Sequence, residues 1–132
     1  MIQEEENLPQ NILNNAFRAP NGELAWPRDS IKEALIEIAK SGMAILGGEV
    51  WGIINGTIQG ILPNKNVYEH PGAWSWDTQE KLSSETWSDY CNRCVRESIE
   101  AISGLAVEDT VHPDFRDKLV FNVCFIKKGE EE

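Results

Sequence analysis

A nearly uncharged, glycine-rich stretch constrains the fold of this chain more than any other part of its sequence. Residues 42–62 carry one charge, Glu49, and include six glycines. The stretch is long enough to be a transmembrane helix. However, an Asn-Gly dipeptide at 55–56 separates two runs rich in β-branched residues, a pattern typical of a two-residue β-hairpin. The stretch therefore predicts two short strands, 49–54 and 57–62, and not a membrane span.

The segment before this hairpin predicts a further piece of strand. Residues 43–46 are apolar, and Gly47-Gly48 then interrupts the run. Glycine inside a strand marks a β-bulge or a place where another backbone approaches closely. We expect one of these two at Gly47-Gly48.

Two helices are predicted on either side of the hairpin. Apolar residues recur with helical spacing over about 29–41, where Ser30 and Glu33 have the spacing of a capping box and Asp29 is the alternative cap. The second helix covers about 84–103 and ends at Gly104.

The other elements are shorter. Residues 12–17 predict a weak helix, 24–27 lead into the first long helix, and 65–81 show no clear period. Residues 119–126 alternate as a strand. The order predicts an α+β domain, a small mostly antiparallel sheet with an N-terminal and a C-terminal helix packed on it.

The chain length of 132 residues suits a single domain, residues 1–132. The net charge of -10 disfavours nucleic-acid binding and docking on anionic membranes. Six of the acidic residues lie at 4–6 and 130–132, within ends (1–8 and 128–132) that we expect to be frayed. The acidic, polar N-terminus predicts no secretory signal, so a cytoplasmic location is expected.

The three cysteines predict packing and not chemistry. Cys91 and Cys94 have the spacing of a zinc knuckle, but the further candidate ligands, Cys124, His70 and His112, do not form a second one. Both thiols also lie in the middle of a predicted helix, where free cysteine usually behaves as a small apolar residue. We expect no metal and no cofactor.

No catalytic motif supports an enzymatic function. The alternative of a small enzyme or ligand-binding domain would need a pocket around Glu49, His70 and His112. Glu49 has a simpler interpretation, as one partner of a structural ion pair or as an exposed residue at a sheet edge. A structural or oligomerisation module is a third possibility, and the oligomeric state is not predicted.

An acidic and aromatic segment is the best candidate for a binding surface. Residues 68–90 contain five of the eleven aromatic residues and five acidic residues against one lysine. Aromatic side chains supply contact area in protein interfaces, and carboxylates steer a basic partner. The predicted contact residues are Trp74, Trp76, Asp77, Glu80 and Glu85. The alternative is that some of these tryptophans belong to the core.

The sequence also resembles a family of immunity proteins from bacterial polymorphic toxin systems. The similarity lies in residues 24–59, which include ILGGEVW, and continues through the spacing of aromatic and charged residues up to Arg93. It covers about residues 24–104, and it departs from the family at 63–75 and in the appended strand 119–126. The matching residues, which we expect to be structural, are Asp29, Gly47, Gly48, Glu49, Trp51, Trp87, Tyr90 and Arg93.

This resemblance implies a non-catalytic, cytoplasmic protein that binds and blocks a co-encoded toxin. The expected partner is therefore a protein, a co-encoded toxin domain for which a basic character is one option, and neither a nucleic acid nor a membrane. The resemblance does not name the toxin.

Overall fold

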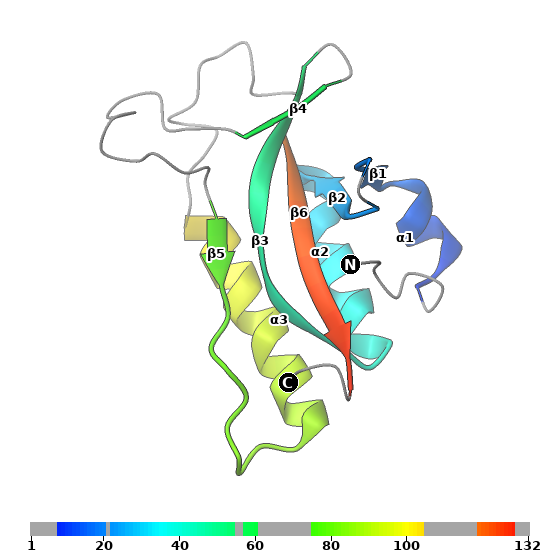
Figure 1. Cartoon of the computed structure of the whole chain (residues 1–132). Coiled ribbons are helices and arrows are strands. Elements are labelled where there is room, and N and C mark those ends of the chain that lie inside the picture. The colour runs from blue at the N-terminus through cyan, green and yellow to red at the C-terminus, as the bar shows by residue number, and fades with distance from the viewer. Residues whose placement is uncertain (1–7, 21, 55–56, 61–74, 105–118, 129–132) are drawn as a thin grey trace, which may run out of the picture.

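The computed structural model describes residues 8–20, 22–54, 57–60, 75–104 and 119–128. Its helices are α1 (Gln10–Asn14), α2 (Arg28–Lys40) and α3 (Trp87–Gly104). Its strands are β1 (Phe17–Arg18), β2 (Leu24–Pro27), β3 (Met43–Ile54), β4 (Thr57–Gly60), β5 (Ser75–Asp77) and β6 (Leu119–Lys127). The fold is the predicted α+β arrangement with an antiparallel sheet (Figure 1).

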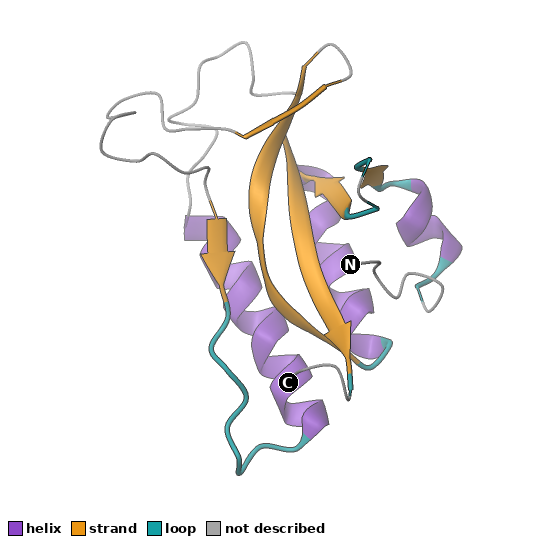
Figure 2. Cartoon of the chain, viewed as in Figure 1, coloured by secondary structure: helices purple, strands orange, loops and turns teal. Residues whose placement is uncertain are grey.

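The sheet has the strand order β1-β2-β6-β3-β4, and β5 pairs with β3 beside this path. The last strand of the chain, β6, therefore lies between β2 and β3 and holds together segments far apart in the sequence. Both long helices lie on the same side of the sheet, behind β3 and β6 in the view of Figure 2.

The main core fills the space between the sheet and these two helices. Alternate residues of β6 point into it, as predicted, and they are Leu119, Phe121, Val123 and Phe125. Helix α2 contributes its apolar stripe, Ile31, Ala34, Leu35 and Ile38. The intervening residues of β6, such as Asn122 and Cys124, point to the opposite side because side chains alternate along a strand.

The hairpin is confirmed by its register. In β3 and β4, Ile54 is paired with Thr57, which leaves two residues for the turn. The turn itself lies outside the described residues. The register of β3 against β6 shifts between Ile45 and Gly47, so the predicted bulge is present. The two predicted pieces of strand, 43–46 and 49–54, form the single strand β3.

Several local predictions were wrong. Pro27 precedes α2, and no side chain caps that end, since the Ser30 hydroxyl donates to the Asp29 carboxylate instead. Residues 24–27 form strand β2 because they pair with β6, and 75–77 pair with β3 inside the segment expected to be irregular. Helix α3 begins at Trp87, where Thr86 accepts a hydrogen bond from the Asp89 N–H.

Candidate partner-binding site

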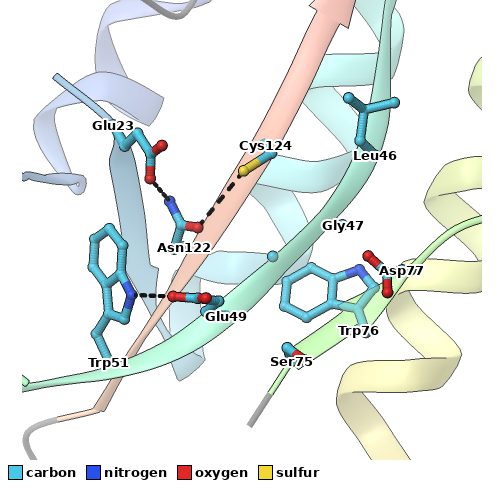
Figure 3. Close-up of a pocket in the computed structure, with 11 residues that line it drawn as sticks. Glu23, Leu46, Gly47, Glu49, Trp51, Ser75, Trp76, Asp77, Asn122 and Cys124 are labelled. Atoms are coloured by element: carbon cyan, nitrogen blue, oxygen red, sulfur yellow. Dashed lines mark hydrogen bonds between the residues drawn. The ribbon is translucent and has the colours of Figure 1, made fainter. Parts of the chain in front are cut away.

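A pocket of about 620 Å³ lies on the side of the sheet that faces away from α2 and α3 (Figure 3). We call this side the helix-free face, with reference to the described part of the chain. Its lining comes from the end of the β1–β2 turn and from β3, β5 and β6: Glu23, Leu46, Gly47, Gly48, Glu49, Trp51, Ser75, Trp76, Asp77, Asn122 and Cys124.

Strand alternation explains which side chains reach this pocket. In β3, Val50 belongs to the core under the helices, so Glu49 and Trp51 point to the other face. Trp51 packs there in a small second apolar cluster with Ala19, Ala25 and Val120. The same alternation places Asn122 and Cys124 of β6 in the pocket.

Gly47 and Gly48 of β3 are required by the close approach of neighbouring backbone. Gly47 has φ of 149°, a conformation that favours glycine. A Cβ atom at Gly48 would collide with the Asn122 carbonyl oxygen and with the Trp76 ring. The prediction of a close backbone approach at Gly47-Gly48 is therefore confirmed along with the bulge.

Hydrogen bonds orient the polar groups of the pocket. The Trp51 indole N–H donates to Glu49 at 3.0 Å. The Asn122 amide, which is 2% exposed, donates to the Glu23 carboxylate at 3.3 Å and to the Leu24 carbonyl at 3.1 Å. The Cys124 thiol is 3.9 Å from the Asn122 amide oxygen. These contacts hold Glu49 and Glu23 in defined positions around the pocket.

The electrostatic character of the pocket is negative. Three carboxylates line it, those of Glu23, Glu49 and Asp77, and its described lining includes no lysine, arginine or histidine. The pKa of Cys124 is raised, first by burial and then by the negative charges of these three carboxylates. The three carboxylates therefore all act on the space around Cys124, and their negative charge favours a cation there.

A second charged cluster, centred on Arg93, holds the segment 78–86 against α3. Arg93 forms a bidentate ion pair with Glu85 (2.6 and 2.9 Å) and a further one with Glu97 (2.8 Å). It also donates to the backbone carbonyl oxygens of Gln79 and Glu80. A guanidinium whose N–H groups all donate hydrogen bonds within the chain is typical of a structural contact.

This cluster changes the acidity of its carboxyl groups. The hydrogen bond from Arg93 lowers the pKa of Glu85 to about 2, assisted by the Leu82 N–H. Burial raises the pKa of Glu97, but hydrogen bonds from the Gln79 N–H and Arg93 outweigh it and leave that pKa lowered. Both carboxylates are therefore ionised at neutral pH.

We expect Arg93→Met to lower the free energy of unfolding by about 2 kcal/mol, because it removes charged hydrogen bonds while keeping the aliphatic stem. A lowered carboxyl pKa adds stability above the unfolded value of 4.5, and that stability is lost as pH falls towards 2. Urea unfolding between pH 5 and pH 2.5 should therefore show a weaker pH dependence in the variant. Arg96→Met, at an exposed position on α3, is the control. Equal pH slopes in the wild type and Arg93→Met would contradict this role.

The structure places the predicted contact residues in different environments. Asp77 and Glu80 are exposed. The prediction that Trp76 is exposed was wrong, because this residue is 6% exposed and its indole N–H donates to Ser98 of α3 at 3.0 Å. Glu85 is largely occupied by Arg93, with a side chain 14% exposed. Trp74 lies outside the described residues.

Each of the four described tryptophans donates a hydrogen bond within the chain. Trp26 donates to the Ile12 carbonyl and fastens α1, and Trp87 donates to the Gly42 carbonyl at the turn before β3. Trp87 also contacts Tyr90 edge to face at 5.4 Å. The aromatic part of the segment 68–90 thus packs α3 and β5, where it is described.

Other predicted residues are placed as follows. Cys91 and Cys94 are buried, as expected, and burial raises the pKa of Cys91 to about 11 and also raises that of Cys94. No group of three or more residues suited to a metal was found within the described ranges. Glu49 is exposed and bonded to Trp51. His70 and His112, its companions in the alternative enzyme site, lie outside those ranges.

Sequence reasoning missed Glu23, Asn122 and Cys124 as lining residues. The alternation of 119–126 contained the signal for two of them, since a polar Asn122 stands between apolar neighbours on the other face. Glu23 had no signal, because only the pairing of β2 with β6 brings it to Asn122.

The family assignment follows from the sequence of residues 13–116, which match the family described as Immunity protein 40. The chain belongs to the Immunity protein 40 family. The match includes β3 with Gly47 and Gly48, α3 with Arg93, and the three carboxylates of the pocket, whereas β6 lies beyond it. No curated protein and no solved structure matches the chain significantly. Among the described residues, no helix is long and apolar enough to span a membrane.

Proposed function

We propose that this protein neutralises a toxin encoded beside it by binding the toxin and covering its active site. The single observation that carries the proposal is the match to the Immunity protein 40 family over most of the chain. In this function the protein needs neither a catalytic group nor a cofactor, and it acts in the cytoplasm, where a co-encoded toxin would threaten the producing cell.

The charge of the molecule supports a basic partner. The net charge is -10, and exposed carboxylates such as Asp77 and Glu80 speed encounter with a cationic surface. These two remain proposed contact residues from the segment 68–90. The packing roles of Trp76 and Glu85 move the proposed contacts away from those two side chains.

The test is co-expression with the product of the adjacent gene. We expect the two proteins to purify together, the purified toxin domain to bind the immunity protein with micromolar or tighter affinity, and toxin activity to fall as the complex forms. An unrelated acidic protein of similar size is the control for non-specific attraction. If no adjacent toxin domain binds at micromolar concentration, the proposed function is wrong.

A further inference from the structure

The helix-free face combines a hollow with exposed groups of two kinds. Glu49 and Asp77 are exposed carboxylates, and Leu46, which also lines the pocket, is 39% exposed although it is apolar. Polar groups around a partly apolar hollow are the usual composition of a recognition surface. The opposite face is occupied by α2 and α3.

The arrangement of the carboxylates favours a cationic side chain. Glu49 is held by the Trp51 N–H, and Asp77 is held on β5 by the pairing of that strand with Gly47 of β3. Glu23 is half-buried and bonded to Asn122, whereas Glu49 and Asp77 are exposed, so these two are the carboxylates that the hollow offers to a partner. Figure 3 shows Glu49 and Asp77 on either side of the β3 backbone.

Charge complementarity also selects among the possible occupants. A second copy of this chain would bring another net charge of -10 against the three carboxylates. The acidic segments 4–6 and 130–132 of the chain itself have the same disadvantage. A basic protein surface, in contrast, gains attraction to the carboxylates, and the stem of a lysine or arginine side chain can pack on Leu46.

We propose that the helix-free face is the surface on which the toxin docks, with a lysine or arginine side chain of the toxin between Glu49 and Asp77. This inference rests on the proposed function and adds the surface and the kind of group it receives. It places the binding surface on β3, β5 and β6, and it leaves the outer faces of α2 and α3 free.

Cys124 provides a test that needs no toxin. It is the partly buried cysteine that lines the pocket, whereas Cys91 and Cys94 are buried. We expect it to react about tenfold faster with a cationic methanethiosulfonate (the ethyltrimethylammonium reagent) than with the anionic ethylsulfonate reagent, relative to the same ratio for glutathione. Glu49→Gln with Asp77→Asn should bring this ratio close to that of glutathione. An unreactive Cys124, or a ratio unchanged by these substitutions, would overturn the proposal.

The second test uses the toxin domain from the adjacent gene. Glu49→Lys with Asp77→Lys should weaken binding by about 100-fold and reduce the salt dependence of association. The matched control is Glu33→Lys with Glu100→Lys, which makes the same charge change at exposed positions on α2 and α3 and should alter affinity by less than about threefold. Circular dichroism and the unfolding midpoint show that both variants are folded.

The outcomes separate this inference from the proposed function. If the toxin binds the wild type and both double variants equally, the docking surface is wrong and the immunity function stands. A loss of binding in the helix variant alone would also overturn the surface. If the toxin does not bind the wild type, the proposed function fails, and the thiol reagents still decide the preference of the pocket for a cation.

Discussion

Gly48→Ala is expected to destabilise the protein by about 3 kcal/mol, because the added methyl group has no space. The Cβ atom would meet the Asn122 carbonyl oxygen of β6 on one side and the Trp76 ring on the other. One of these contacts is with backbone, so β3 and β6 must separate to relieve it. Urea unfolding followed by tryptophan fluorescence measures the loss.

Gly104→Ala is the matched control for this prediction. Gly104 ends α3, and within the described part of the chain no neighbouring atom lies within 4 Å of the position that its Cβ would occupy. Alanine is also the better helix former, so this variant should be as stable as the wild type or slightly more stable. An equal loss in both variants would show that crowding at Gly48 is not the cause.

Trp76→Ala is expected to lower the free energy of unfolding by about 3–5 kcal/mol, the usual cost of removing a buried large aromatic side chain. The indole lies over Gly48, belongs to the main core, and connects β5 to α3 through its bond to Ser98. Thermal and urea unfolding should both record the change. Because β5 carries Asp77, the variant should also weaken toxin binding indirectly.

The hydrogen bond can be separated from the packing with milder variants. Ser98→Ala should cost about 1 kcal/mol, and combining it with Trp76→Phe should add little to the loss in Trp76→Phe alone. If Trp76→Phe keeps its stability and yet loses toxin affinity, Trp76 is a contact residue, as the sequence first indicated.

The predictions that succeeded rested on local patterns. The Asn-Gly dipeptide predicted the hairpin, the helical spacing of Ile31 to Ile38 predicted α2, and the alternation in 119–126 predicted β6 and its buried face. Each pattern depends on residues within a few positions of one another, so a single sequence contains the complete signal.

The failures have a common physical cause as well. Residues 24–27 and 75–77 are strands because β6 and β3 supply hydrogen-bonding partners from distant parts of the chain. Tryptophan is a residue type typical of interfaces. In the structure, however, Gly48 leaves room for the Trp76 ring, and the Ser98 hydroxyl accepts a hydrogen bond from its indole N–H. Neither partner is visible from the segment in which Trp76 occurs.

The sequence by itself determined the α+β class, the two long helices, the hairpin with its bulge, and the resemblance to immunity proteins. Only the tertiary structure decided which acidic residues form a pocket. It brought Glu23, Glu49, Asp77, Asn122 and Cys124 together from four separate parts of the chain, and it gave Trp76 and Glu85 packing roles. The reason is that local periodicity specifies elements, whereas strand pairing across long separations specifies which side chains share a face.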